Sequence, residues 1–363
     1  MTELPLHEFH HGLGAHFAEV NGMEVVDHYG DALSEHVALR DTAGVLDLSF
    51  RGRLSVAGAD RQRFLNGQVT NNVKELRSGE GCYAALVTAR GKMVSDLNIY
   101  CLPDELLLDF EPGLTGAVTE RLEKFVIADD VQVVDAAPHY ALLSVQGPES
   151  AGVVNHLGLG LALPGKPFAS TSVKEPTLGE IYCMCQPRVG TAGFDLFVPV
   201  ATLAAAADKL IAAANAMGGR ACGWRALEMA RIEAGIPRFG ADMDESNLAP
   251  EAGIEERAIS YSKGCYIGQE VIARIRTYGQ VAKSLRGLLL ADDLPNLPGK
   301  GDQLFHGDKE AGFITSALAS PRFRRKIALG YVRREWNEPG TKLRVRTLDG
   351  ESPAIIVPLP FRF

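Results

Sequence analysis

The sequence has 363 residues, enough for two or three domains with separate cores, and its 46% hydrophobic and 23% charged content is ordinary for a globular protein. The net charge of −8 argues against a generic binder of nucleic acids or of anionic membranes. No stretch approaches the roughly 18 apolar residues of a membrane span. The N-terminus MTELPLHEFHHGLG lacks the features of a signal peptide. The six cysteines are scattered and form no CxxC pair, a pattern that suits a reducing compartment. We therefore expect a cytoplasmic protein that neither enters a membrane nor binds nucleic acid directly.

The first fifty residues are expected to form a helix, a loop and a second helix that ends in DTAGVLDLSF, residues 41–50. Asp31 precedes the segment ALSEHVALR, whose apolar residues share one face, and its carboxylate can cap a helix there. A short strand, RLSVAG, follows, and Asp60 is then the expected N-cap of a further helix that continues through Gln68.

A weak internal repeat links two parts of the chain. The segments LSVAGAD (54–60) and LSVQGPE (143–149) share Leu-Ser-Val and the glycine, and each reads as a strand, a glycine turn, an acidic cap and a helix. Chance similarity is the alternative explanation. If the repeat is real, it predicts two related α+β halves.

Both halves then follow a similar predicted plan. Residues 79–110 read as three strands separated by turns. A helix around Val118, Leu122, Phe125 and Val126 and a strand at VQVVD are predicted to follow. In the second half, EIYCMCQP and GFDLFVPV read as strands, and an alanine-rich helix runs from Thr202 to Gly218-Gly219.

The C-terminal part differs from the rest in its pattern of short apolar segments and turn residues. After the helix Trp224–Gly235 and a loop rich in turn residues, six short strands separated by Gly, Pro and Asp follow Gly279. Six strands in about 80 residues predict a small antiparallel barrel. We accordingly divide the chain into residues 1–279 and a C-terminal domain of residues 280–363.

The stretch KGCYIGQE, residues 263–270, concentrates chemically special residues. It holds the amine of Lys263, the thiol of Cys265 and two glycines that permit a sharp bend or a close backbone approach. A cysteine near a helix N-terminus and close to a lysine has two reasons to favour its thiolate. The alternative is a tight loop with an inert cysteine.

Three polar residues stand where apolar ones would be easier to accommodate. Asp96 lies inside the predicted strand MVSDLNIY, Asp195 inside GFDLFVP, and Arg231 on the predicted helix. A carboxylate in a strand needs water, a partner or a ligand, so each is either on a solvated face or in a site shared by the halves. The pair Cys183 and Cys185 is expected to be buried in a sheet, and Walker, HExxH, GxSxG and complete GxGxxG motifs are absent from the sequence.

Several segments resemble the glycine-cleavage T-protein superfamily of tetrahydrofolate-binding proteins over essentially the whole chain, among them LHEFHHGLGAHF, HYGDALSEHVALRDTAGVLDLS, MARIEAGIPRFG, LAPEAGI and IALGYV. KGCYIGQE resembles the YgfZ/Iba-type branch, whose folate-binding members assist the maturation of iron–sulfur enzymes. Aminomethyltransferases of the superfamily typically have KGDFIGRE there, with aspartate in place of Cys265 and arginine in place of Gln269.

The resemblance implies an α+β fold of the aminomethyltransferase T-protein type: a three-domain cloverleaf with two interleaved α+β domains, within residues 1–279, and a C-terminal antiparallel β-barrel. It also implies a folate site. Asp195 matches the carboxylate that grips the guanidine-like edge of the pterin, although the family usually has the longer glutamate. Tyr83 and Tyr100 match aromatic positions of that pocket, and Arg231 matches its arginine.

Asp96 matches the acid that works near the one-carbon unit, although Ser95 replaces the neighbouring acid of the transferases. The leading hypothesis is a tetrahydrofolate-binding accessory protein for iron–sulfur cluster assembly or repair, serving tRNA-modifying enzymes, with Cys265 as a transient cluster ligand or redox thiol. One thiol cannot complete a cluster's shell of about four ligands, so iron–sulfur partner proteins would supply the rest. The alternatives are a folate-dependent aminomethyltransferase or methyltransferase with Asp96 as acid/base, and a folate carrier without chemistry.

Overall fold

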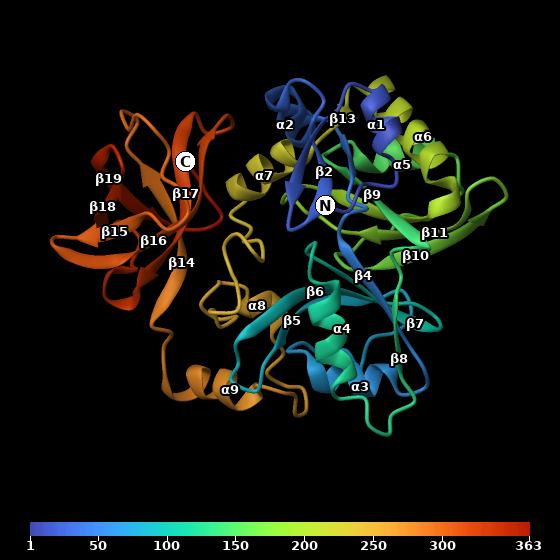
Figure 1. Cartoon of the computed structure of the whole chain (residues 1–363), viewed down its shortest axis with the longest axis horizontal. Helices are drawn as coiled ribbons and strands as arrows, with labels where there is room; N and C mark the ends of the chain where they lie inside the picture. Colours follow the sequence, from blue (N-terminus) through green and yellow to red (C-terminus); the bar gives the residue numbers. More distant parts are fainter. The chain divides into compact units, whose positions relative to one another are not determined.

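The computed structural model describes residues 1–363, apart from the side chain of residue 278, and the chain divides into two compact units (Figure 1). The first unit comprises Met1–Leu86, Ser95–Ala230 and Ser262–Tyr266. The second comprises Val87–Val94, Arg231–Tyr261 and Ile267–Phe363. Each unit therefore gathers segments that are far apart in the sequence.

One sheet of the first unit has five antiparallel strands in the order β5-β6-β7-β4-β8. Their bounds are β4 Gly52–Ala57, β5 Gly81–Val87, β6 Met93–Cys101, β7 Glu105–Phe110 and β8 Gln132–Asp135. Helices α3 (Arg61–Gln68) and α4 (Thr115–Glu123) lie together against this sheet (Figure 1) and bury Phe64, Leu65, Val118 and Leu122. This confirms the three strands and the helix predicted between residues 79 and 126, although Phe125 and Val126 lie beyond the end of α4.

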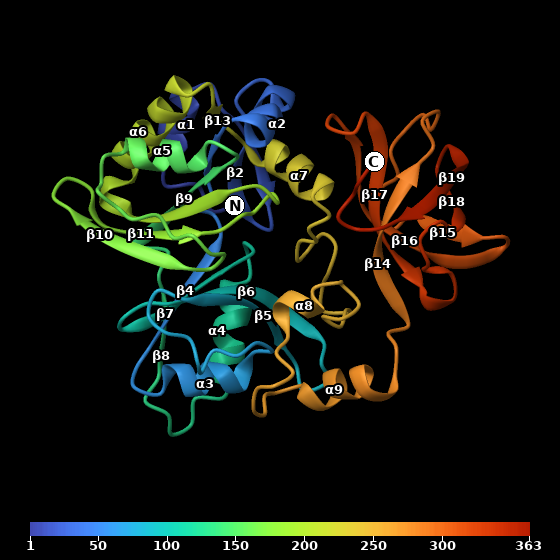
Figure 2. The same ribbon diagram turned by 180° about the vertical axis from the view of Figure 1, so that it is seen from behind.

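The other sheet of the first unit has six strands in the order β10-β11-β12-β9-β3-β13. They are β3 Gly44–Asp47, β9 Tyr140–Gln146, β10 Ser170–Glu175, β11 Gly179–Cys185, β12 Gly193–Pro199 and β13 Arg220–Ala221, and β13 alone pairs in parallel, with β3. Figure 2 shows α1 (His7–Gly12), α5 (Ser150–His156) and α6 (Leu203–Ala216) grouped beside this sheet. Their apolar side chains form one core with Val145, Leu196 and Cys183. The predicted burial is thus confirmed for Cys183, whereas Cys185 packs against this core and is half-buried.

The N-terminal segment differs from its prediction. Two strands, β1 (His16–Val20) and β2 (Met23–His28), form a separate antiparallel ribbon between α1 and α2 (Ala32–Asp41). The predicted ending DTAGVLDLSF contains strand β3 in place of a helix end, because pairing with β9 outweighs local preference there. Asp31 does cap α2, since its side chain accepts from the backbone N–H of Leu33.

The two sheets interleave in the sequence and reproduce the predicted repeat. Strand β3 precedes β4 in the chain but pairs with β9 in the other sheet. After β4 and after β9 the chain turns through Gly58 and Gly147, with φ of 105° and 123°, and enters a helix. A Cβ at Gly58 would lie 2.1 Å from the carbonyl oxygen of Asp130, and one at Gly147 would lie 2.4 Å from that of Thr42, so both turns need glycine.

The repeat's acidic positions act differently from the prediction. Asp60 occupies the N-cap position of α3 but makes no side-chain cap bond to the helix. Its carboxylate instead accepts from the backbone N–H of Asp130 and from Arg63. The acid therefore holds a neighbouring loop rather than the helix end.

The second unit contains the predicted barrel, which is closed in the order β14-β17-β16-β15-β18-β19. Its strands are β14 Lys283–Leu290, β15 Gln303–His306, β16 Lys309–Ser320, β17 Arg325–Arg333, β18 Lys342–Thr347 and β19 Gly350–Val357. Alternating apolar residues fill its interior, among them Leu288, Ile314, Val345 and Ile356.

The remaining elements are short. They are helices α7 Trp224–Glu233, α8 Glu255–Ala258 and α9 Gln269–Tyr278, and the 3-10 turns η1 Val200–Thr202 and η2 Arg334–Trp336. Among the helices that the structure describes, none combines the length and the apolar character that a membrane span requires.

Candidate functional site

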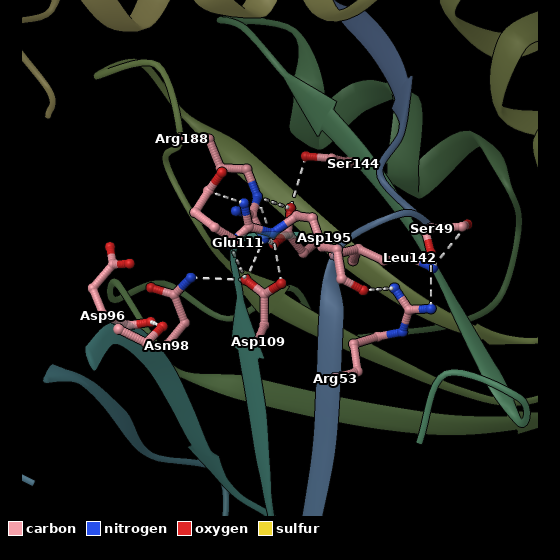
Figure 3. A network of polar contacts seen from close by, with 12 residues as sticks. Ser49, Arg53, Asp96, Asn98, Asp109, Glu111, Leu142, Ser144, Arg188 and Asp195 are labelled. Atoms are coloured by element: carbon pink, nitrogen blue, oxygen red, sulfur yellow. Dashed lines mark hydrogen bonds and ion pairs between the residues drawn. The ribbon is translucent and has the colours of Figure 1, made fainter. Parts of the chain in front are cut away.

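The two sheets of the first unit turn polar side chains toward each other. Strand β6 places Asp96, Asn98 and Tyr100 on one face, because side chains of a strand alternate with a period of two. Opposite them, β12 contributes Asp195, which is paired across the sheet with Ser144 of β9. Figure 3 shows the resulting network, with Asp96 at one end.

Arg188, on the loop between β11 and β12, is the centre of this network (Figure 3). Its Nε donates to Asp195 at 2.9 Å and 3.1 Å, and its Nη2 donates to Asp195 at 2.5 Å and to Asp109 at 2.7 Å. Ser144 donates to the same Asp195 carboxylate at 2.7 Å. Both oxygens of Asp195 are therefore engaged, in the forked geometry that suits a guanidinium.

Asp109 connects the two sheets. It accepts from Arg51 Nε at 2.7 Å and from Asn98 Nδ2 at 2.8 Å, in addition to Arg188. Burial alone would raise the pKa of Asp109, but Arg188 and Arg51 outweigh burial and hold that pKa well below its usual range. Arg51 also donates to Glu111, so each buried charge of this cluster has an opposite charge beside it.

Asp96 is in a different state from the other carboxylates. Its Oδ2 accepts a hydrogen bond from the hydroxyl of Tyr83 at 2.8 Å. Its Oδ1 is shielded from solvent and has no hydrogen-bond partner among the described residues. Burial, and next the negative charge of Glu111, raise the pKa of Asp96 to about 6, against the opposing effect of the Tyr83 bond.

Tyr100 supplies a second unused polar atom. The side chain is fully buried against Phe168 and Phe197, with ring centroids 6.5 Å and 6.1 Å away, and its hydroxyl has no partner among the described residues. A buried hydroxyl without a partner costs free energy, so it marks a position where a polar ligand group would be stabilised. Of the predicted folate residues, the structure thus brings Tyr83 to Asp96 and places Tyr100 on the same strand face.

Arg231 belongs to the second unit and is engaged there. It is 4% exposed, forms an ion pair with Asp242 and donates to the hydroxyl of Ser316 at 3.1 Å. Asp242 in turn accepts from Thr315, so the arginine anchors a loop to the barrel strand β16.

Cys265 lies outside the network. It is the one exposed thiol among the six free cysteines. Three residues, 266–268, separate it from Gln269, the first residue of α9, so it precedes the helix by about one turn's length of chain. Lys263 directs its amine to the backbone carbonyls of residues 66, 69 and 71 instead of to this thiol.

The two glycines of the KGCYIGQE stretch differ. Gly268 has φ of 86°, and a Cβ there would lie 2.5 Å from the carbonyl oxygen of Thr88, so this position requires glycine. A Cβ at Gly264 would have open space, so nothing in the structure explains glycine there. Among the described residues, no group of three or more His, Cys, Asp or Glu side chains is placed to hold a metal ion.

Sequence reasoning did not find Arg188, Asp109, Arg51, Asn98 or Ser144. The signal available for Asn98 is its spacing of two from both Asp96 and Tyr100, which places all three on one face. Arg188 sits in a loop, where neither periodicity nor a motif gives its direction, and only the fold brings it to Asp195.

The chain was compared with known proteins. It matches the GCVT N-terminal domain family over residues 6–263 and the glycine cleavage T-protein C-terminal barrel domain family over residues 283–362. It is 30% identical to an aminomethyltransferase of Rubrobacter xylanophilus, over 99% of this chain and 94% of that protein, and 31% identical to one of Mycobacterium avium, over 90% and 88%. The crystal structure of the glycine cleavage system aminomethyltransferase T from Bartonella henselae matches with a TM-score of 0.89, covering 99% of this chain and 98% of that one at 24% identity. The shared fold confirms the predicted α+β class with interleaved halves and a C-terminal barrel.

Proposed function

Because the chain belongs to the glycine-cleavage T-protein family, we propose that it is a tetrahydrofolate-dependent aminomethyltransferase in which Asp96 is the acid/base. This is the function that the named relatives support, since those described above are aminomethyltransferases that align along nearly the whole chain. It replaces the iron–sulfur accessory role as the leading hypothesis.

The state of Asp96 carries the proposal. A general base works best when its pKa lies near the operating pH, and burial raises the pKa of Asp96 to about 6. One of its oxygens is held by Tyr83, and the other is shielded and has no protein partner among the described residues. A carboxyl group that is half-buried, fixed in orientation and left with one unused oxygen is typical of catalytic acids and bases.

The residues around Asp96 divide the work of proton transfer. The Tyr83 hydroxyl donates to Oδ2 and so fixes the carboxylate plane and leaves Oδ1 as the oxygen that takes or releases the proton. Tyr100 offers its hydroxyl from the same face of β6 to a polar group of the ligand. A bound tetrahydrofolate would supply the nitrogen that accepts the one-carbon unit.

The residues around Asp96 fit a folate, whereas Asp195 is already paired with Arg188. The unpartnered oxygens of Asp96 and Tyr100 are suited to a polar ring system between aromatic walls. The Asp195 carboxylate, proposed to grip the pterin, is engaged by the guanidinium of Arg188. A pterin edge would have to replace Arg188 at Asp195, or the pterin would be held by the Asp96 side alone.

The test of the proposal is the Asp96→Asn variant, assayed for methylene-tetrahydrofolate formation in a glycine-cleavage mixture that lacks its own T-protein. We expect a loss of about 10²- to 10⁴-fold in kcat, the usual effect of removing a general acid or base. Folding should survive, because the raised pKa means that ionised Asp96 destabilises the folded state at neutral pH. Unchanged kcat would refute the role of Asp96.

Two measurements complete this test. The exposed Asp208→Asn variant is the matched control and should keep full activity. Calorimetric titration of tetrahydrofolate into the wild-type protein and the Asp195→Ala variant then asks whether Asp195 contributes to binding. If the variant binds with unchanged affinity, the pterin is not gripped by Asp195.

The accessory role in iron–sulfur assembly remains the second candidate, and the observation in its favour is the exposure of Cys265. It predicts that Cys265→Ser abolishes support of iron–sulfur enzymes in cells, whereas the transferase proposal predicts that this variant keeps aminomethyltransferase activity. Comparing both readouts in Cys265→Ser and Asp96→Asn separates the two functions.

A further inference from the structure

A cavity lies between the same two sheets of the first unit, and it is lined by residues of both. It has a volume of about 260 Å³, and its floor is formed by the buried side chains of Leu102, Leu107 and Phe197. Leu102 directly follows the last residue of β6 and comes six residues after Asp96. At about 3.3 Å per residue of strand, the two residues are roughly 20 Å apart. The cavity therefore lies away from Asp96, although Phe197 of its floor also packs against Tyr100.

Two tyrosines form an aromatic wall of this cavity. Tyr140 of β9 and Tyr182 of β11 meet edge to face, with ring centroids 5.7 Å apart and an interplanar angle of 67°. Faces of such rings carry negative charge density and attract cations. Together with the two leucines and Phe197, the tyrosine rings form apolar walls that suit methyl and methylene groups.

The charged residues of the lining are negative. The lining includes the carboxylates of Glu105 and Asp135 and one histidine, His139, and contains no lysine or arginine. One oxygen of Glu105 accepts a hydrogen bond from Ser55, which fixes the carboxylate at the wall. Burial, and next the charge of Glu180, raise the pKa of both wall tyrosines, as expected where negative charge is close.

We propose that this cavity binds a compact organic cation, a small molecule with a quaternary or tertiary ammonium group. Such a group presents apolar methyls to the aromatic and aliphatic walls and a diffuse positive charge to Glu105 and Asp135. An anion would be repelled by the two carboxylates. A neutral apolar molecule would cover Glu105 without compensating its charge, which costs free energy.

The proposal is tested by isothermal titration of the full-length protein with choline chloride. The neutral isostere 3,3-dimethylbutan-1-ol, which has the same shape without the charge, should bind about tenfold more weakly, because the cation–aromatic and carboxylate attractions are lost. Equal binding of the two compounds, or no saturable heat with choline, would overturn the proposal.

Variants locate the site. Glu105→Gln and Tyr182→Leu should each weaken choline binding about fivefold, and the exposed Glu75→Gln should leave it unchanged. Because Tyr182 also packs against the core, Glu105→Gln serves as the independent variant if Tyr182→Leu fails to fold. Wild-type affinity in Glu105→Gln contradicts the proposal.

The outcome is separable from that of the proposed transferase activity. Asp96→Asn should bind choline as the wild-type protein does, since Asp96 does not line the cavity. Loss of choline binding in Asp96→Asn would place the cation in the Asp96 site and contradict binding in the cavity lined by Glu105 and Tyr182.

Discussion

Asp96 illustrates how one residue type takes different roles in one layer of the protein. Asp109 and Asp195 lie between the same two sheets but are matched with guanidinium groups, and arginine neighbours hold the pKa of Asp109 well below its usual range. Asp96 receives a neutral phenol instead of an arginine, so burial dominates and its pKa rises. Burial raises the pKa of Asp195 as well, in spite of Arg188, so Asp96 differs from both other carboxylates by having one oxygen without a hydrogen-bond partner among the described residues.

The pH dependence of the reaction should report this carboxyl. If Asp96 acts as the base, it must be ionised, so kcat is expected to fall about tenfold per pH unit below a pH of about 6 and to level off above it. The measurement is kcat between pH 5 and 8. The Tyr83→Phe variant removes a hydrogen bond that lowers the pKa of Asp96, so the inflection of its kcat–pH curve should move to higher pH. An inflection that stays in place would argue against Asp96 as the titrating group.

At the scale of elements, the KGCYIGQE stretch is organised by its lysine. The amine of Lys263 donates to the carbonyls of Asn66, Val69 and Asn71 at 2.6 Å, 2.8 Å and 2.6 Å. These carbonyls lie at and just beyond the C-terminal end of α3, where carbonyl groups lack helical partners and favour a cation. Burial lowers the pKa of Lys263 to about 8, and the three acceptors match the three N–H groups of its ammonium form.

Replacing this lysine should destabilise the first unit. Lys263→Met removes three hydrogen bonds from a charged donor and leaves buried carbonyls without partners, so we expect a loss of about 3 kcal/mol in the free energy of unfolding. Urea denaturation measures this loss. The matched control is Lys124→Met, which changes an exposed lysine and should alter stability by less than about 0.5 kcal/mol; a similar loss in both variants would contradict the capping role.

At the scale of the whole molecule, a chain of buried charges joins the two interleaved halves of the first unit. Arg51 and Asp109 come from the five-stranded sheet and its entry. Arg188, Asp195 and Ser144, which Figure 3 labels, come from the six-stranded sheet and its loop. Removing one member of such a cluster leaves an uncompensated buried charge, which costs more than the pair contributes.

Asp109→Asn is therefore expected to lower the free energy of unfolding at pH 7 by about 3–5 kcal/mol, because both arginines lose their shared partner. The depressed pKa of Asp109 stabilises the folded state above the unfolded value of about 3.9 and loses this contribution as the pH falls below it. The variant should thus lose less stability than the wild-type protein between pH 5 and 3, measured by thermal unfolding. Asp208→Asn is the control, and a parallel acid dependence in both variants would rule out this contribution of Asp109.

Elements whose residue patterns are local could be predicted from the sequence alone. The six barrel strands follow from alternation between Gly and Pro turns, and the paired turns at Gly58 and Gly147 follow from a repeated motif that only glycine can complete. Asp96 and Asp195 were detectable because a carboxylate in a strand is costly without a partner. The resemblance to a folate-binding family added roles that the residues alone did not.

The tertiary structure decided which partners those residues have. It placed Arg188, a loop residue, on Asp195, seven residues away, and the Tyr83 phenol of the neighbouring strand on Asp96, thirteen residues away. The contact between the sheets, from Arg188 to Asp109, joins residues that are 79 positions apart. The tertiary structure also turned Lys263 toward the end of α3 rather than toward the exposed Cys265. Sequence spacing sets which face a side chain occupies, but only packing sets the charge and solvent exposure it meets there, and these determine its chemistry.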